Sequence, residues 1–364
     1  MKQRTSPRTV AELAVASPLE PMEALAVKEI PTGPGWQYEP KWDGFRCVAF
    51  RAGSEVVLQS KAGKRLDRYF PELVDTLVAL PTRRFVVDGE IVIPMDGGLS
   101  FDALLQRIHP APSRVARLAR ETPCRLMLFD LLLDARGRSR LAVPLAARRP
   151  ELEAFWEKAG SRVAGVALSP ATRDLAIVRR WFERGGRSLD GVVAKLLDAP
   201  YTPGERGAMR KVKHERTADC VVGGFRWASG GEEAGERHIG SLLLGLYDAE
   251  GKLDHVGFTA SFARDQREAI TRRVAALRGG RGFTGNAPGG PSRWSTERSA
   301  DWEPVKPELV VEVAFDHTSG GRFRHGTRLV RFRPDKSPEQ CTREQLESVA
   351  ADAALFTVDA NEEP

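Results

Sequence analysis

The chain has 364 residues, of which 41% are hydrophobic and 29% are charged, and its formal net charge is +6. This length exceeds one ordinary hydrophobic core, so two domains are expected, and the composition fits a soluble globular protein. The modest positive excess suits a polyanionic partner.

Cysteine spacing and hydropathy exclude several classes of protein. The four cysteines lie far apart in the sequence, so zinc-ligand spacing is absent and a disulfide framework is not expected. Free thiols in a reducing compartment are the expectation. The first 22 residues lack the continuous apolar core of a signal peptide, and no segment is long enough to span a membrane. These features predict a cytoplasmic protein.

The first part of the chain mixes strands and helices. After an irregular, proline-rich stretch at residues 1–35, β-type runs cover 46–50, 55–59, 85–93 and 126–133, and a further buried strand covers 191–197. Helical patterns cover 100–108, 145–156 and 174–184. Because the two kinds of element do not strictly alternate, the pattern favours an α+β domain with antiparallel sheets.

The pattern changes near residue 215. Strands are predicted at 219–227, 239–247, 253–259 and 309–315, with one helix at 263–277 and a last helix at 342–354. Several short strands with a single interrupting helix favour a small barrel such as an OB-fold. We therefore expect an α+β domain at residues 1–213 and a barrel domain with a C-terminal helix at 214–364.

The segment Glu39-Pro-Lys-Trp-Asp-Gly-Phe-Arg46 carries the most chemical information. Its pattern predicts that Lys41 points into a pocket, that Asp43-Gly44 forms a tight turn, and that Arg46 returns along the next strand. Taken alone, the segment is equally compatible with a hairpin turn whose charges are solvated, because a short motif needs agreement from its context.

A strand at residues 86–92 contributes two acids, Asp88 and Glu90. Residues two apart on a strand share a face, so both carboxylates are expected to line one pocket. An edge strand with solvated acids is the alternative. The β-branched residues on both sides of the pair favour burial, and buried acids need partners.

Two later segments repeat this arrangement. Asp190 stands at the mouth of an apolar strand with Lys195 at its other end, and Lys211 and Lys213 share a face of another strand. Phe129, at the end of a further strand, is a candidate platform for a base, although such residues more often belong to the core. For the two lysines the ordinary alternative is a solvated face.

Together these residues suit attack by a lysine on a nucleotide. Lysine is a weak nucleophile at its free pKa of about 10.4, and nearby cations and burial lower that value. Attack on an α-phosphorus also needs cations on the phosphates, a role for Lys211 and Lys213, and a divalent metal held by carboxylates, a role for Glu90 and Asp190. Oxygen ligands and phosphates favour Mg²⁺, with Mn²⁺ as an alternative.

The ordered series resembles the covalent nucleotidyltransferases: DNA ligases, RNA ligases and mRNA capping enzymes. It looks most like the bacterial ATP-dependent DNA ligases of the ligase C type, which the segments 68–73, 106–110 and 217–222 also resemble. The resemblance covers roughly residues 18–336. It implies a nucleotidyltransferase domain with ATP-grasp-like antiparallel sheets and helices, followed by an OB-fold β-barrel domain.

The resemblance also implies a role for each candidate residue. In the first domain it implies that Lys41 accepts AMP, that Glu39 and Phe129 contact adenine, and that Arg46 contacts the nucleotide and later DNA. It also implies that Glu90 contacts ribose and metal and that Asp190 is a metal ligand. The α-phosphate is then bound by Lys211 and Lys213. In the barrel domain it makes Arg331, Arg333, Asp335 and Lys336 the motif that orients pyrophosphate, with Arg331 and Arg333 on one strand face. Contacts with DNA are expected from Lys61, Arg46, Arg322 and Arg324.

Three features depart from the family pattern, one of which is that Met209-Arg210 precedes Lys211 where the family commonly has a Trp. Asp190 stands where most members have Glu, although Asp occurs there in the ligase C group. Lys61 stands where Arg is common, which keeps the charge but loses the bidentate fork of a guanidinium.

The sequence therefore predicts an ATP-dependent DNA ligase that seals nicks in double-stranded DNA through lysyl-AMP and adenylated DNA, in DNA repair. We expect a nucleoid-associated monomer without membrane contact, whose two domains close on DNA. RNA ligases and capping enzymes are alternatives with the same nucleophile, and NAD-dependent ligases are a poorer one. A DNA-binding protein with an inactive ligase fold is the non-enzymatic alternative.

Overall fold

The computed structural model describes residues 9–346 except 96–97, 160, 162, 185–188, 214–215, 229–236, 263 and 290–300. The described residues form two compact units, 9–213 and 216–346. Most of the helix predicted at 342–354 lies outside the described residues. Its described beginning contains a short 3-10 helix, Arg343–Leu346.

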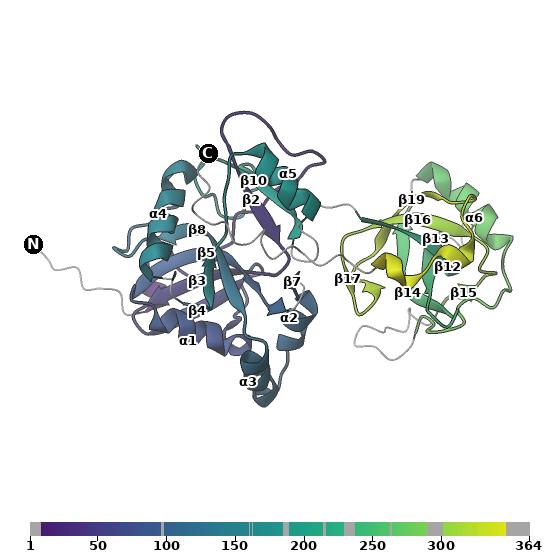
Figure 1. Cartoon of the computed structure of the whole chain (residues 1–364), viewed down its shortest axis with the longest axis horizontal. Helices are drawn as coiled ribbons and strands as arrows, with labels where there is room; N and C mark the ends of the chain where they lie inside the picture. The colour runs from purple at the N-terminus through teal and green to yellow at the C-terminus, as the bar shows by residue number, and fades with distance from the viewer. Residues whose placement is uncertain are drawn as a thin grey trace, which may run out of the picture. The chain divides into compact units, whose positions relative to one another are not determined.

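Two sheets build the first unit (Figure 1). The larger sheet has the strand order β4-β3-β5-β8-β9 and consists of β3 (Phe45–Ala52), β4 (Glu55–Ser60), β5 (Arg84–Val92), β8 (Arg125–Leu133) and β9 (Val166–Leu168). The smaller sheet has the order β1-β11-β10-β2 and consists of β1 (Leu25–Ala26), β2 (Trp36–Trp42), β10 (Leu189–Leu196) and β11 (Met209–Lys213). Pairing is antiparallel except at β1–β11 and β8–β9.

Helices cover these sheets. They are α1 (Pro71–Ala79), α2 (Phe101–Arg107), α3 (Pro112–Glu121), α4 (Leu145–Ala159) and α5 (Leu175–Arg184), with 3-10 turns at Val10–Glu12 and Asp67–Tyr69 and a small hairpin of β6 (Pro94–Met95) and β7 (Gly98–Leu99). Helix α4 packs on β8, α5 on β10 and α1 on β4. Our sequence analysis missed α1 and α3, which each begin with a proline whose fixed φ suits the first helical turn.

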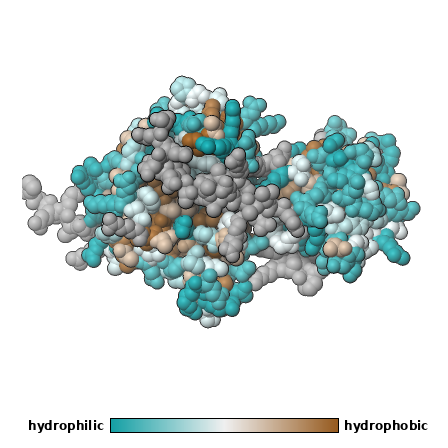
Figure 2. Space-filling view, viewed as in Figure 1, coloured by the Kyte–Doolittle hydropathy of each residue, from teal (hydrophilic) through white to brown (hydrophobic). Residues whose placement is uncertain are grey.

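The larger sheet is buried on both faces. Cys47, Ala49 and Leu58 belong to one core, whereas Val48 and Phe50 belong to another on the opposite face, as the alternation of side chains along a strand requires. All four cysteines of the chain are buried free thiols. In the view of Figure 2, hydrophobic residues are exposed on part of the first unit, whereas the second unit is mostly hydrophilic.

The second unit is a closed five-stranded barrel. Pairings join β12 (Arg216–Trp227) to β13 (Ile239–Tyr247), β13 to β14 (Leu253–Ser261), β14 to β19 (Thr327–Phe332), β19 to β16 (Val310–Phe315) and β16 back to β12. Only the β14–β19 pair is parallel within this ring. Closure removes the free sheet edges, which is how small OB-type barrels satisfy their backbone.

Short elements complete the second unit: a 3-10 turn at Arg264–Gln266, helix α6 (Arg267–Ala275), the strands β15 (Glu303–Pro304), β17 (Thr318–Ser319) and β18 (Arg322–Phe323), and a 3-10 turn at Pro338–Gln340. The helix predicted from residue 263 thus begins as α6 at Arg267. The limits of β19 were not predicted: the family resemblance implied a strand face for Arg331 and Arg333, but Arg328 and Arg331 make the segment itself resemble a solvated one.

One buried histidine makes the second unit sensitive to acid. Burial, and then the positive charges of Arg322 and Arg226, lower the pKa of His255 to about 3. In the unfolded chain the His255 imidazole is protonated as pH falls through about 6.5, whereas in the folded unit it stays neutral until a much lower pH. Stability is therefore lost as pH falls below about 6.5.

We expect the free energy of unfolding of this unit to fall by up to about 1.4 kcal/mol per pH unit between about pH 6 and 4. Hydrogen exchange in β13 and β14 at several pH values measures this effect. His255→Leu should flatten the dependence, whereas His325→Leu, at an exposed position, should leave it unchanged. Equal slopes in wild type and His255→Leu would refute the assignment.

Candidate active site

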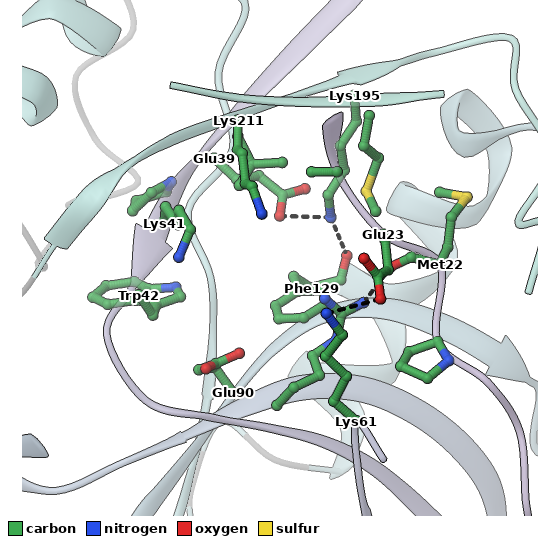
Figure 3. A pocket seen from close by; sticks show the side chains of 16 residues that line it. Met22, Glu23, Glu39, Lys41, Trp42, Lys61, Glu90, Phe129, Lys195 and Lys211 are labelled. Atoms are coloured by element: carbon green, nitrogen blue, oxygen red, sulfur yellow. Dashed lines mark hydrogen bonds and ion pairs between the residues drawn. The ribbon is translucent and has the colours of Figure 1, made fainter. Parts of the chain in front are cut away.

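A cavity of about 200 Å³ lies between the two sheets of the first unit (Figure 3). Both sheets contribute side chains, and so does the segment that precedes β1. The lining residues are Pro21, Met22, Glu23, Ala24, Glu39, Pro40, Lys41, Trp42, Arg46, Lys61, Glu90, Phe129, Val193, Lys195, Met209 and Lys211. Seven of the first-domain candidate residues therefore line one cavity.

Lys41 points into this cavity from β2 (Figure 3). Its ammonium lies 2.5 Å from a carboxylate oxygen of Asp190, and the Lys213 ammonium lies 3.5 Å from the same oxygen. The antiparallel pairing of β10 with both β2 and β11 produces this arrangement, because Gly191 is opposite Lys41 on one side and Lys213 on the other.

The turn after Lys41 differs from our prediction. Strand β2 pairs with β10, whereas β3 pairs with β4 and β5, so Asp43-Gly44 connects two different sheets and does not close a hairpin. A Cβ on Gly44 would lie 2.3 Å from the carbonyl oxygen of Ile91. Glycine is therefore required here, because the backbone passes too close to β5 for any side chain.

A second glycine places Asp190. Gly191 has a φ of +136°, and a Cβ there would lie 2.0 Å from the Val212 carbonyl oxygen. The register between β10 and β2 shifts at this point. Such a bulge redirects the neighbouring side chain, and here the neighbour is the buried carboxylate that meets Lys41.

Only one of the two acids of β5 lines the cavity. Glu90 does so, and burial raises its pKa to about 7 against the opposing effect of Arg46 and Lys41. Asp88 lies fully buried and receives two hydrogen bonds from Arg46, of 2.6 and 2.5 Å. The expectation that both carboxylates line the pocket was therefore wrong for Asp88, which holds Arg46. Both acids follow the alternation of β5, because the extra residue at the irregular β5–β8 pairing is Phe129 on β8. Asp88 does not line the cavity because Arg46 and Tyr201 bind its carboxylate.

Another ion pair lies deeper in the cavity. The Lys195 ammonium is 2.7 Å from Glu39, donates a 3.2 Å hydrogen bond to the Phe129 carbonyl oxygen and lies 4.7 Å from the centre of the Phe129 ring. The Arg46 guanidinium also lies over that ring, at 4.6 Å. The Phe129 ring therefore lines the cavity between two cations, Arg46 and Lys195.

The remaining cations lie around the cavity. Burial, followed by the charges of Lys41 and Lys213, lowers the pKa of Lys211. Lys61 pairs with Glu23 at 2.8 Å, and Arg206 pairs with the same carboxylate at 2.9 Å.

The last motif along the chain, which consists of Arg331, Arg333, Asp335 and Lys336, lies in the second unit. Arg333 and Lys336 both contact Asp219, at 2.9 and 2.8 Å, and Arg333 also binds Asp335, whose pKa it lowers to about 2. Strand β19 ends at Phe332, and Arg331 pairs separately with Glu312. Both arginines nevertheless meet neighbouring acids, because Glu312 and Asp219 are opposite each other on β16 and β12.

The two arginines expected to contact DNA lie at and just after β18. Arg322 is exposed and its guanidinium lies 2.6 Å from Nδ1 of His255. Arg324 donates its backbone N–H to the His317 carbonyl oxygen.

Glu90 and Asp190 suit a magnesium ion by their chemistry. Both are hard oxygen donors: Glu90 lines the cavity and Asp190 contacts the cavity residue Lys41. Mg²⁺ commonly binds one or two carboxylates together with substrate phosphates. Within the described residues, no three His, Cys, Asp or Glu side chains are grouped as a metal cage.

Sequence reasoning missed several residues that support the site. Lys195 was named only as the end of its strand. Its pairing with Glu39 could have been predicted, because a buried acid needs a cation and β10 pairs with β2. Asp219 and Tyr201, whose hydroxyl donates a 2.7 Å hydrogen bond to Asp88, had no distinguishing pattern. Met22 also lines the cavity, and its backbone oxygen accepts a 3.2 Å hydrogen bond from Arg46.

Known proteins with similar sequences share both units of this chain. The family model described as "ATP dependent DNA ligase domain" matches residues 16–213, and that described as "ATP dependent DNA ligase C terminal region" matches residues 235–336. The chain is 44% identical to DNA ligase C2 of Mycolicibacterium smegmatis, over 93% of this chain and 96% of that protein. It is 42% identical to DNA ligase C of Mycobacterium tuberculosis, over 92% and 96% of the two chains.

Solved structures agree on the fold. A structure reported as a structure–function analysis of Lig E DNA ligases matches 86% of this chain and 99% of its own, with a TM-score of 0.52 and 16% identity. The predicted α+β nucleotidyltransferase domain followed by an OB-fold barrel is confirmed. The chain belongs to the ATP-dependent DNA ligase family.

Proposed function

We propose that this ligase seals nicks between a 5′-phosphate and a 3′-hydroxyl in double-stranded DNA through lysyl-AMP on Lys41. The observation that supports this most directly is the position of Lys41 in a cavity that also contains Glu39, Glu90 and Lys211. A lysine nucleophile requires an amine beside a site for a nucleotide and cations for its phosphates.

The reaction has three steps. The Lys41 amine attacks the α-phosphorus of ATP, a P–N bond forms, a proton is lost and pyrophosphate leaves. The 5′-phosphate of the nick then attacks the same phosphorus, the P–N bond breaks, and the Lys41 nitrogen takes up a proton and leaves as the free amine, which gives adenylated DNA. In the last step the 3′-hydroxyl attacks the 5′-phosphorus, loses its proton, and AMP leaves.

The other residues of the cavity have roles in binding and charge compensation. We assign Glu39 and Phe129 to adenine, Glu90 to ribose, Arg46 to the nucleotide and then to the nick, and Lys211 to the α-phosphate. The Arg46 guanidinium is held in one orientation, because it donates two hydrogen bonds to the buried Asp88 carboxylate.

Two further residues of the first unit, Lys213 and Asp190, act at the phosphates of the nucleotide. Lys213 contacts the α-phosphate, and Asp190, with Glu90, holds Mg²⁺ or, as an alternative, Mn²⁺. The metal would supply positive charge to the transferring phosphoryl group.

Incubation with nucleotides labelled in the AMP moiety tests the proposal. The protein with Mg²⁺ and [α-³²P]ATP should become covalently labelled, and the label should move to DNA when nicked duplex is added. Labelled NAD should give no product. A protein that binds nicked DNA but never takes the label would instead be an inactive ligase fold.

Binding of nicked DNA should depend strongly on salt. Arg46, Lys61, Arg322 and Arg324 are proposed to meet phosphates, and each neutralised phosphate contributes about −0.9 to the slope of log K against log salt concentration. Titration of a fluorescent nicked duplex between about 50 and 200 mM salt measures this slope. An affinity that does not change with salt would contradict a phosphate-contacting surface.

The last motif should act only in the first step. We propose that Arg333, Asp335 and Lys336, with Arg331, orient the pyrophosphate that leaves Lys41. Arg333→Ala with Lys336→Ala should slow self-labelling by at least about 100-fold, because two cations at the leaving group are lost. Sealing of pre-adenylated nicks should stay within about threefold of wild type.

A control with the same charge loss distinguishes this role from attraction of DNA. Lys252 and Arg272 are exposed in the same unit, and replacing both with Ala should leave self-labelling intact. If the motif variant labels normally and fails only with DNA, the cluster is a DNA-attracting surface instead.

Further assignments concern the surroundings of the enzyme. We propose a monomer that acts in DNA repair in the cytoplasm, in association with the nucleoid, where repair proteins are potential partners. None of the helices in the described part of the chain has the length and hydrophobicity of a membrane span.

A further inference from the structure

Lys195 is the residue of the cavity that neither the nucleophile nor the phosphate sites explain. It lies on β10 with only 5% of its surface exposed. Its ammonium contacts Glu39 and both the carbonyl oxygen and the ring of Phe129 (Figure 3). One cation therefore holds the two residues that we assign to adenine.

We propose that Lys195 is a positioning residue that gives the enzyme its preference for ATP over GTP, by pairing with the Glu39 carboxylate and holding it in place. This inference rests on the proposed function, since it requires that Glu39 meets the edge of the base. It adds the residue that sets which purine nucleotide the cavity accepts.

Purine chemistry explains why the charge of Glu39 matters. Adenine presents an amino group, a donor, where guanine presents the oxygen O6, an acceptor. An ionised carboxylate only accepts hydrogen bonds, so it binds the adenine amino group and repels O6. A protonated carboxylic acid has a donor as well and loses this discrimination.

The surroundings of Glu39 make Lys195 its main partner. Glu39 is 2% exposed, and its Oε2 meets Lys195 at 2.7 Å. The other oxygen accepts a 3.0 Å hydrogen bond from Gln37, and Arg149 lies 3.9 Å from it. Arg149 is engaged by Glu153 and the Ser169 carbonyl oxygen.

Removing Lys195 therefore leaves a deeply buried carboxylate without its close cation. Such a group takes up a proton or moves toward water, because an unpaired buried charge is expensive. Either outcome removes the fixed acceptor for adenine. The hydrogen bond to the Phe129 backbone is lost at the same time, so the adjacent wall of the cavity loosens.

The test compares self-labelling with [α-³²P]ATP and [α-³²P]GTP in wild type, Lys195→Met and Lys195→Arg. In Lys195→Met the KM for ATP should rise about 10- to 100-fold, as expected for loss of a charged hydrogen bond. The preference for ATP over GTP should fall at least about tenfold, and kcat with ATP should change less than KM. Lys195→Arg, which keeps the charge, should recover part of the preference.

Two further variants separate specificity from stability. Arg107 is also fully buried and pairs with Glu72 at 2.7 Å outside the cavity, so Arg107→Met should lower Tm without changing the ATP preference. Glu39→Gln should reduce the preference like Lys195→Met, and the double variant should be no worse than either single change. Glu39→Gln also tests the pair if Lys195→Met does not fold.

The outcomes are distinct. An unchanged ATP preference in folded Lys195→Met, or an equal loss in Arg107→Met, would overturn the inference. So would a wild-type enzyme that accepts both nucleotides equally. A wild-type enzyme that takes no label from ATP would instead refute the proposed function itself.

Discussion

Lys41→Ala should abolish covalent labelling by ATP, reducing it by at least about 1,000-fold, since the loss of a nucleophile removes the reaction path and not merely binding. The other lysines that line the cavity lie elsewhere: Lys195 pairs with Glu39, Lys61 pairs with Glu23, and Lys211 lies on β11. Gel analysis of the protein after incubation with [α-³²P]ATP and Mg²⁺ measures the result.

Two control variants, Lys41→Arg and Lys158→Ala, accompany this experiment. Lys41→Arg should fail equally, because a guanidinium keeps its proton and cannot attack. Lys158→Ala, at an exposed position on α4, should label like wild type. The Lys41→Ala enzyme should still join pre-adenylated nicks, since that step has no use for the amine. Normal labelling of the variant would place the nucleophile elsewhere.

Asp190→Asn should reduce self-labelling by at least about 100-fold while Tm changes little. The buried carboxylate contacts both Lys41 and Lys213, and its replacement removes a proposed metal ligand together with the contact that places the nucleophile. The two lysines retain access to water, so their loss of a partner is tolerated by the fold. Rates of labelling and thermal unfolding curves test both parts.

The length of the side chain provides a matched comparison. Asp190→Glu keeps the charge and restores the residue that is common in the family, so it should retain most activity. Asp198→Asn, at an exposed position after the same strand, should have no effect. Near wild-type activity of Asp190→Asn at saturating Mg²⁺ would show that the acid is only a structural ion pair.

Long apolar runs explain which elements could be predicted. The strands β5 and β8 are buried on both faces and stand out by composition, and their predicted limits differ from the observed ones by one residue at most. Helix α1 is short and half-exposed, so its periodic signal was weak. Helix α3 is short but amphipathic, so its pattern could have been recognised. The limits of β19 were not predicted, because arginines occupy two of its exposed positions and hide the apolar pattern.

The site was predictable by residue type but not by partner. Acids next to glycines indicated Glu90 and Asp190, and a lysine shortly before Asp43-Gly44 indicated Lys41, because each stands on or beside a strand that must be buried. Which acid meets which lysine depends on strand register and on the bulge at Gly191. The sequence contains no direct signal for that register, so the separate role of Asp88 beneath Arg46 appeared only in three dimensions.

The burial of every native thiol has a practical consequence for spectroscopy. Burial raises the pKa of Cys47, Cys124 and Cys220 well above the ordinary value and that of Cys341 to about 11, so these thiols react slowly with maleimides. A cysteine introduced at Lys158 in one unit and another at Lys252 in the other would carry a fluorophore pair on the otherwise unmodified enzyme. Energy transfer between the dyes would then follow the distance between the units during each catalytic step.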